Sequence, residues 1–259
     1  MTILGVLGES NKITEPEREQ IIATVIEAAD GRIPVCVGTS HSGTDTCIVY
    51  SQQAEAMGAQ SVMVAPPKLS RPNDAALRRH YLAVADAISI PVVVQDHPAS
   101  SNVFMSVEFI AELGRESAQC RYLKLEDVPS PTKVSQVRKA NPDIMIFGGL
   151  GGMMFLEELR HGAHGTMTGF AFPDILVDIY QKFTSGDVDG ATEVFYRYCP
   201  LIRFENQPLI NLPLRKHIYH IRGAIASART RAPFMPVDED TLADLNDILT
   251  RLDLIAETA

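Results

Sequence analysis

Residues 121–127 of the chain read RYLKLED, and the turn-forming residues VPSP follow at 128–131. The stretch has the composition of a short β-strand with a lysine at its centre. Side chains alternate along a strand, so Tyr122, Lys124 and Glu126 share one face. If that face points into a closed barrel, burial disfavours the hydrated ammonium form of Lys124, and the neutral amine can attack a carbonyl. The alternative is a lysine at a strand end whose ammonium reaches water.

Short apolar segments like this one recur along the chain, and each is followed by a segment with helical periodicity. We expect strands at about 1–7, 34–38, 61–65, 90–95, 122–125, 144–147 and 165–168. We expect helices at about 14–29, 44–57, 73–87, 106–114, 131–140 and 173–183, and one more that follows the loop 148–152 and ends near residue 162. Regular alternation of this kind predicts a parallel sheet with right-handed crossovers. Seven strands fit either an open doubly wound sheet or a (β/α)8 barrel that is short of one unit.

Helix-start signals support these assignments. Thr14 and Glu17 have the spacing of a capping box, and Asp187 has the position of an N-cap. Beyond residue 186 only helical patterns remain, at about 187–203, 206–222 and 238–256. We therefore expect a barrel at 1–185 and a C-terminal helical extension at 186–259 that packs on it, because no long linker separates the two.

The composition indicates which kinds of partner and which cell compartment suit the protein. The chain has 259 residues, 46% of them hydrophobic, which suits one large α/β domain or two small ones. Its net charge of −9 disfavours nucleic acid and anionic membrane surfaces as partners. The four cysteines lack metal-ligand spacing and are typical of reduced thiols in a cytoplasmic protein. No apolar run reaches the length of a membrane span.

Polar and glycine residues gather where the predicted strands end. These ends read GVLGE at 5–9, GTSH at 38–41, APPK at 65–68, QDHP at 95–98, KLED at 124–127, GGLGG at 148–152 and TGF at 168–170. The carboxyl ends of parallel strands carry the active sites of (β/α)8 and open α/β proteins. Ordinary loop composition accounts for part of this distribution, so it indicates a site without identifying its chemistry.

Together these segments resemble the dihydrodipicolinate synthase / N-acetylneuraminate lyase family, the pyruvate-type class I aldolases, over essentially the whole chain. Four family motifs have similar counterparts here: Gly-Thr-Thr-Gly-Glu at 5–9, Tyr-Asn-x-Pro at 95–98, the lysine strand at 123–126 and Gly-Ala-x-Gly at 162–165. The resemblance implies a (β/α)8 barrel in which Lys124 forms a Schiff base with a 2-oxo acid.

The implied function is a lyase, either an aldolase or a dehydratase, with a keto-deoxy sugar acid as one candidate substrate. The resemblance implies no metal and no organic cofactor. It also implies a homotetramer, which a chain that lacks the first unit of the barrel need not keep. Backbone N–H groups of Leu7 and Gly8 would hold the substrate carboxylate. Glu9, Asp96, Gly149 and Met167 complete the implied substrate-binding set.

Several positions depart from the family pattern. The family tyrosine that relays protons falls at Gln95, and an amide cannot replace a phenol in that role. The two threonines of the first motif become Val6 and Leu7. We hypothesise that Glu126, aided by His97 or by a water held by Gln95, takes over proton transfer. The alternative for Glu126 is a solvated loop residue, or an ion pair with Lys133 or Arg71.

The resemblance has two further consequences. Family chains carry a leading strand and helix before the first motif, whereas Met1 here coincides with the start of the second strand. We therefore expect the first β/α unit to be missing from this sequence, through a misplaced start or a truncation. The loss of the tyrosine and both threonines also leaves an alternative function open, namely a catalytically degraded barrel that binds a metabolite or a protein partner.

Overall fold

Seven parallel strands form one sheet in the computed structural model, which describes residues 1–255. The sheet follows the order of the sequence, each strand pairing with the next: β1 (Thr2–Ile3), β2 (Cys36–Gly38), β3 (Ser61–Val64), β4 (Val92–Asp96), β5 (Tyr122–Leu125), β6 (Met145–Gly148) and β7 (Gly165–Thr166). A doubly wound sheet reverses its strand order at a switch point, and this one does not. The sheet is therefore wound in one direction, as in a barrel.

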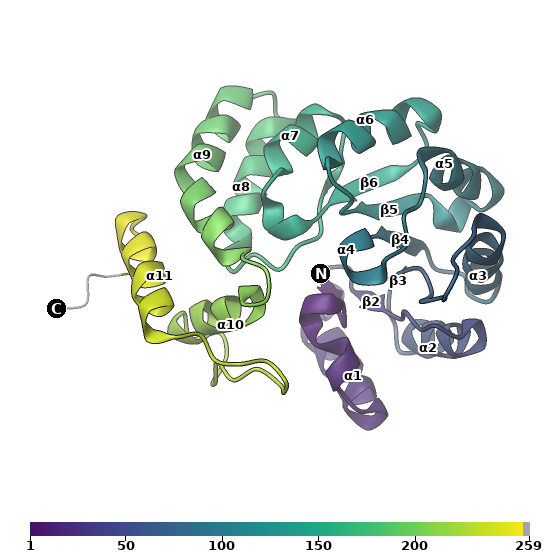
Figure 1. The fold of residues 1–259 in the computed structure, drawn as a ribbon, viewed down its shortest axis with the longest axis horizontal. Coiled ribbons are helices and arrows are strands. Elements are labelled where there is room, and N and C mark those ends of the chain that lie inside the picture. The colour runs from purple at the N-terminus through teal and green to yellow at the C-terminus, as the bar shows by residue number, and fades with distance from the viewer. Residues whose placement is uncertain (256–259) are drawn as a thin grey trace. The chain divides into compact units, whose positions relative to one another are not determined.

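Helices follow the strands in the expected alternation (Figure 1). Their bounds are α1 (Glu15–Ala29), α2 (Thr44–Ala56), α3 (Asp74–Asp86), α4 (Pro98–Ser101), α5 (Val107–Glu116), α6 (Ser130–Ala140), α7 (Phe155–Arg160), α8 (Pro173–Thr184), α9 (Val188–Glu205), α10 (Asn211–Ile221) and α11 (Glu239–Arg251). The capping box at the start of α1 is confirmed, since the Thr14 amide donates to Glu17 Oε2 at 2.8 Å. Asp187 caps α9 by accepting a hydrogen bond from the Gly190 amide.

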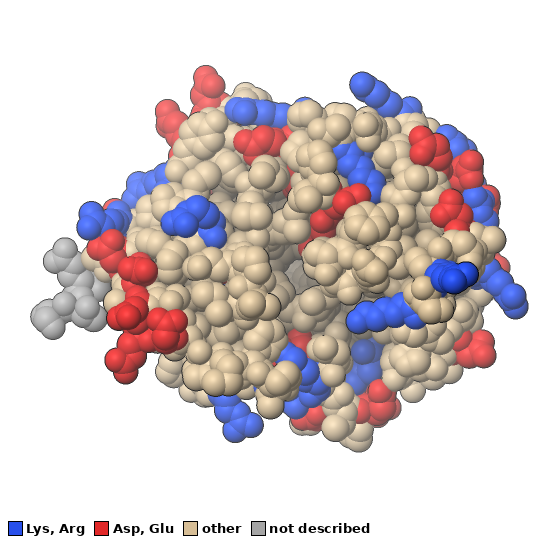
Figure 2. Space-filling model, in the orientation of Figure 1, with Lys and Arg blue, Asp and Glu red and all other residues tan. Residues whose placement is uncertain are grey.

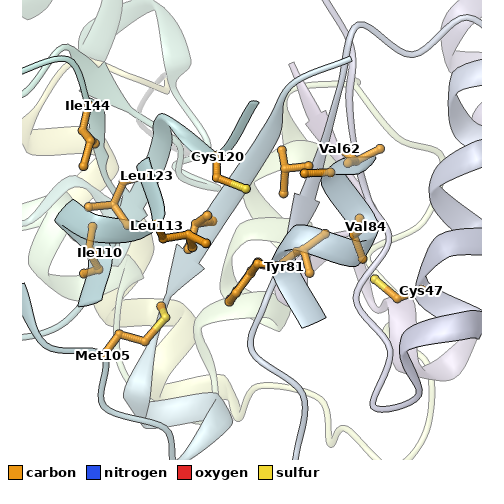
Figure 3. Packing of buried hydrophobic residues seen from close by; sticks show 14 of the residues in the cluster. Cys47, Val62, Tyr81, Val84, Met105, Ile110, Leu113, Cys120, Leu123 and Ile144 are labelled. Carbon is orange, nitrogen blue, oxygen red and sulfur yellow. The ribbon is translucent and has the colours of Figure 1, made fainter. Parts of the chain in front are cut away.

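The two faces of the sheet have different surroundings. Alternate residues on one face, such as Val62, Val94 and Leu123, pack against the helices in the larger core. Figure 3 shows part of this core, with Tyr81 of α3 and Leu113 of α5 among its members. The other face carries a small cluster of Cys36, Met63 and Val93, with Tyr122 and Met167 packed against it. Helices on one face and a small side-chain cluster on the other are the arrangement of a barrel wall.

By their contacts, the residues divide into two compact units. The first comprises Met1–Gly148 and Arg160–Met167, and holds the sheet with α1 to α6. The second comprises Gly149–Leu159 and Thr168–Ala259, and has a hydrophobic core of its own that includes Phe155, Ile179 and Leu214. The division predicted at residues 185 and 186 stays a prediction.

The first and last strands are only two residues long, well short of their predicted ranges, and the short helix α4 was not expected. The segment 1–7 was predicted as strand, but β1 ends at Ile3 because Leu4 has a left-handed backbone with φ of 56°. A 3-10 turn, Val6–Gly8, follows it. The strand expected at 165–168 ends at Thr166. The short helix α4 begins at Pro98, whose fixed φ suits the first turn of a helix.

Acidic and basic side chains are interspersed on the face seen in Figure 2, in small groups separated by uncharged residues. That face carries no broad basic area. Among residues 1–255, no helix combines the length and the apolar character needed to cross a membrane.

Candidate active site

A lysine, a glutamate and a glutamine meet at the ends of β4 and β5. Lys124 Nζ lies 3.0 Å from Glu126 Oε2, and both side chains are largely buried, with 13% and 9% of their surface exposed. Gln95 Nε2 donates a hydrogen bond to the same Glu126 Oε2 at 2.8 Å. One carboxylate oxygen is therefore held between an ammonium and an amide donor. Of the three residues predicted to be catalytic, Glu126 therefore contacts both of the others.

Strand pairing explains why these side chains meet. Gln95 of β4 is the register partner of Lys124 of β5, so their side chains point to the same side of the sheet. The Glu126 amide donates to the Asp96 carbonyl at 2.8 Å, which extends the ladder one residue beyond β5. Glu126 therefore keeps the strand alternation and shares the face of Lys124, as the sequence predicts.

A cavity of about 290 Å³ opens beside Gln95 at the carboxyl ends of β1 to β4. Its lining combines apolar and hydroxyl-bearing residues: Leu4, Gly5, Val6, Ser10, Asn11, Ser40, His41, Ser42, Met63, Ala65, Pro66, Pro67, Lys68, Gln95, Ser100 and Ser101. Hydroxyl, amide and imidazole groups can donate to and accept from the hydroxyl groups of a ligand. The cavity is therefore chemically suited to a small polyhydroxylated molecule.

Two of the lining segments are held by specific contacts. Ser40 Oγ accepts a hydrogen bond from the Ala65 amide at 2.8 Å, which joins the residues after β2 to those after β3. His97 Nδ1 is 2.7 Å from Ser100 Oγ, within the turn that begins α4. His97 therefore has a local hydrogen-bond partner next to the cavity, and its predicted help to Glu126 stays a prediction.

Asp96 was predicted to bind substrate, but its side chain points to the opposite face of β4 from Gln95. It is fully buried, and its Oδ2 accepts a hydrogen bond from Lys133 Nζ at 2.7 Å. Burial, which outweighs the attraction of Lys133, raises the pKa of Asp96 to about 6. The aspartate that stands where the resembled motif has asparagine is thus paired with a buried lysine. Asp96 does not line the cavity, and neither do Lys124 and Glu126, so only Gln95 of the contacting group borders it.

The predicted carboxylate-binding turn differs from expectation in one respect. The Gly8 amide donates to the Gly5 carbonyl at 3.0 Å, so that amide is already used within the turn. Leu7 lies in the same 3-10 turn, and Glu9 follows it as a buried residue in the left-handed conformation, its Oε1 3.6 Å from Lys12 Nζ. Val6, one of the threonine replacements, lines the cavity directly.

The last two predicted substrate-binding residues lie in different units. Met167 belongs to the first unit and packs against Cys36, Met63 and Val93 on the face that Lys124 shares. Gly149 belongs to the second unit and precedes a 3-10 turn at Leu150–Gly152. Substrate binding by either residue remains a prediction.

Sequence reasoning missed the serines of the cavity and the acidic partners of Lys133. Ser10, Ser42 and Ser100 line the cavity but belong to no recognised motif, since serines in loops carry little signal. Lys133 was considered as a partner for Glu126, yet it pairs with the neighbouring carboxylates Asp96 and Asp127. The lysine lies in a helix after a charged turn, and only the spatial register of β4 and β5 reveals which acid it meets.

The arrangement can perform proton transfer beside a nucleophilic amine. At 3.0 Å, Glu126 Oε2 is within hydrogen-bond reach of Lys124 Nζ and can accept its proton. Gln95 cannot relay a proton, but its amide restricts where the carboxylate points. Within residues 1–255, no group of three or more histidine, cysteine, aspartate or glutamate side chains has the arrangement of a metal site.

Comparison with known proteins gives consistent matches along the chain. The model of the Dihydrodipicolinate synthetase family matches residues 1–252. L-2-keto-3-deoxyarabonate dehydratase of Azospirillum brasilense is 35% identical over 258 residues, which cover 98% of this chain and 83% of that protein. 4-hydroxy-tetrahydrodipicolinate synthase of Methanosphaerula palustris is 30% identical over 257 residues, covering 96% of this chain and 85% of that protein.

Solved structures of dihydrodipicolinate synthases also match the chain over nearly its whole length. The crystal structure of dihydrodipicolinate synthase from Rhodopseudomonas palustris superposes with a TM-score of 0.91 at 32% identity, covering 96% of this chain and 85% of that one. The dihydrodipicolinate synthase from Thermotoga maritima superposes with a TM-score of 0.89 at 25% identity, covering 98% and 87%.

Proposed function

The chain belongs to the dihydrodipicolinate synthetase family, and we propose that within it the chain is a dehydratase of a 2-keto-3-deoxy sugar acid. Its relatives are lyases that form a Schiff base with a 2-oxo acid. The particular reaction, the substrate class and the catalytic residues are our proposal. The observation that carries it is the contact of Lys124 with Glu126, whose carboxylate is also held by Gln95.

The first step is imine formation. Glu126 accepts a proton from the Lys124 ammonium, and the free amine attacks the C2 carbonyl of the substrate. The resulting carbinolamine loses its hydroxyl group together with the proton on Glu126, as water. A protonated imine now joins Lys124 to C2 and Glu126 is again ionised, so protons and charge balance.

Elimination follows from the same geometry. The protonated imine acidifies C3, the carbon next to C2, and the Glu126 carboxylate lies beside the imine nitrogen, where it can take the C3 proton. The enamine that forms expels the C4 hydroxyl, which leaves as water with the proton returned by Glu126. Hydrolysis of the conjugated imine releases the product and restores Lys124. One carboxylate therefore serves both transfers, a role that the amide of Gln95 cannot fill.

Two observations favour dehydration over the condensation that gives dihydrodipicolinate synthases their name. The relative with 35% identity is named as a 2-keto-3-deoxyarabonate dehydratase. The cavity beside Gln95 presents several hydroxyl groups, which suit the hydroxylated tail of a sugar acid. We infer that Leu7, Gly8, Glu9, Gly149 and Met167 contribute to substrate binding, as the family resemblance implies, and that Asp96 acts behind the site.

The finer architecture is also a proposal. It is a (β/α)8 barrel, with the helices of 186–259 as an appendage and a homotetramer as the assembly. Support comes from the sequential order of the seven described strands and from the side-chain cluster on the face away from the helices. Sedimentation analysis measures the assembly directly.

A second candidate function rests on a specific observation. The tyrosine and two threonines of the family pattern are Gln95, Val6 and Leu7 here, and Gln95 and Val6 line the cavity. A barrel altered in this way could bind a metabolite without turning it over. The two candidates differ in one measurable property, which is covalent chemistry at Lys124.

The test is to trap the imine. The protein is treated with pyruvate or 2-keto-3-deoxyarabonate and borohydride, then digested and analysed by mass spectrometry. We expect a reduced adduct on Lys124 with both compounds, and loss of water from the sugar acid when borohydride is omitted. A Lys124→Met variant, which keeps the length of the side chain, is the matched control. An unmodified Lys124 with both compounds would favour the binding role instead.

A further inference from the structure

A second buried lysine lies behind the Lys124–Glu126 pair. Lys133, in α6, has 11% of its side chain exposed, and its ammonium has three acceptors. Nζ donates to Asp96 Oδ2 at 2.7 Å, to Asp127 Oδ2 at 2.8 Å and to the Met105 carbonyl at 2.6 Å. Three acceptors match the three N–H bonds of an ammonium. Lys133 therefore joins three segments of chain that leave the carboxyl ends of β4 and β5.

Two of the three partners adjoin a residue of the candidate site, and the third ends a loop that borders the cavity. Asp96 follows Gln95, and Asp127 follows Glu126. Between them, the Glu126 amide donates to the Asp96 carbonyl at 2.8 Å, so Glu126 lies between two segments that the same ammonium holds. Met105 ends the loop that begins with α4, whose residues Ser100 and Ser101 line the cavity.

We propose that Lys133 is a positioning residue, which holds Glu126 within reach of Lys124 by binding Asp96 and Asp127 on the opposite side of the sheet. The inference rests on the proposed function, since it deepens the role of Glu126 in proton transfer. Lys133 touches neither Lys124 nor Glu126 in any contact described above. Its effect passes through the backbone of the two neighbouring aspartates.

Charge explains why a cation is needed at this point. Asp96 is fully buried and is repelled by the negative charges of Asp127 and Glu126. Its Oδ1 has no hydrogen-bond partner among the described residues, so its pairing depends on Oδ2 and Lys133. Without the ammonium, Asp96 and Asp127 would lose the cation between them on one side of the sheet, while Glu126 on the other side adds to the repulsion on Asp96. Repulsion would separate the ends of β4 and β5, and the contact of Gln95 with Glu126 would be lost.

A double-mutant cycle separates positioning from a general structural role. The variants are Lys133→Met, Glu126→Gln and their combination, assayed with pyruvate at a temperature where all are folded. The measured quantity is the rate at which Lys124 forms its borohydride-trapped adduct. We expect Lys133→Met to slow adduct formation by about 10- to 100-fold in the parent protein. In the Glu126→Gln background it should change the rate by about twofold or less, because the group it positions is already disabled.

The control variant is Arg78→Met. Arg78 joins α3 to α5 through ion pairs with Glu112 and Glu116, in the same unit but among the helices. It should leave the trapping rate within about twofold of the parent. If Lys133→Met does not fold, Asp127→Asn replaces it. Asp127 is 21% exposed, and its substitution weakens one contact of Lys133 while leaving Asp96 paired. We expect Asp127→Asn to slow trapping by roughly three- to tenfold, again only when Glu126 is present.

Equal rate losses in both backgrounds would overturn the proposal, because a residue that merely stabilises the fold acts additively. A crystal structure of Lys133→Met, or of Asp127→Asn, is the second readout and does not depend on chemistry. We expect Glu126 to move away from Gln95 in it. An unchanged Lys124–Glu126–Gln95 arrangement would also overturn the proposal. The proposed function fails separately, if the parent protein forms an adduct with pyruvate yet does not dehydrate the sugar acid.

Discussion

Glu126 has two opposing effects on Lys124. The ion pair at 3.0 Å holds the Lys124 ammonium, which must lose a proton before its amine can attack a carbonyl. The same carboxylate accepts the proton whose removal creates the nucleophile, and it remains near the imine to take the next proton. Gln95 also holds Glu126 in place, since its amide donates a hydrogen bond to the same carboxylate oxygen. In the proposed mechanism, Glu126 and Gln95 take the place of the tyrosine that the family resemblance leads one to expect.

The first prediction concerns this carboxylate. Glu126→Gln should lower kcat for the sugar acid by roughly 10²- to 10³-fold, because an amide cannot carry either proton. Binding contacts are largely kept, so KM should change by less than about threefold. Steady-state kinetics over a range of pH provide the measurement. Retained turnover with an unchanged pH dependence would contradict the assigned role, and the parent-like variant Glu112→Gln serves as the control.

At the scale of elements, the chain that follows β1 approaches the end of β2 closely, and this approach shapes the part of the cavity that Leu4 and Gly5 line. A Cβ on Gly38, at the end of β2, would lie only 2.2 Å from the Leu4 carbonyl oxygen. Arg18 Nη2 also donates to the Gly38 carbonyl at 2.8 Å, so this backbone is held on two sides. Leu4 and Gly5 line the cavity, and their positions therefore depend on glycine at residue 38.

Gly38→Ala tests that dependence. The added methyl group must displace the backbone of Leu4, and we expect the free energy of unfolding to fall by about 2 kcal/mol or more. Substrate binding should weaken at the same time, because the displaced residues line the cavity. Urea denaturation and KM measure the two effects. Gly8→Ala is the matched control for stability, since a Cβ there meets no atom within 4 Å. Equal stabilities of the two variants would argue against the close approach.

At the scale of the whole molecule, each compact unit contains a buried carboxyl group paired with a cation. In the second unit, Glu205 is fully buried and its Oε1 lies 2.5 Å from Arg215 Nε. Glu205 also accepts a hydrogen bond from the Ala171 amide, while Arg215 donates to Asn206. Burial outweighs the attraction of Arg215 and raises the pKa of Glu205 to about 7. Glu205 therefore joins residue 171 to α10 in the interior of the second unit.

These raised pKa values predict how stability varies with pH. A carboxyl whose folded pKa exceeds its unfolded value adds stability that is complete below the unfolded pKa and is lost as pH rises through the folded pKa. For Glu205 that window runs from 4.5 to about 7, and for Asp96 from 3.8 to about 6. The stability advantage of the parent over Glu205→Gln should thus shrink by about 2 kcal/mol between pH 4.5 and pH 7.5.

Urea denaturation at a series of pH values measures this difference, and Asp96→Asn should behave in the same direction at lower pH. Subtraction of each variant from the parent removes the contributions of all other titrating groups. An advantage that grows with rising pH would mean that the ion pair with Arg215 outweighs burial.

The sequence by itself determined what depends on local periodicity. The alternation of short apolar strands with helices predicted the parallel sheet, and the period of two along a strand put Lys124 and Glu126 on one face before any contact was known. The capping box of α1 followed from a spacing of three residues in the same way. Each of these features is set by neighbours in the chain.

Only the tertiary structure decided the contacts between distant segments. The register of β4 against β5 brings Gln95 to Glu126 and turns Asp96 away towards Lys133, across 31 and 37 residues of sequence. The sequence left Glu126 and Lys133 as a candidate pair, because both charges lie within reach along the chain. The directions of the side chains at the strand ends determine that Lys133 pairs with Asp96 and Asp127. The hydroxyl groups of the cavity come together for the same reason, since they belong to separate loops whose meeting point is set by the sheet.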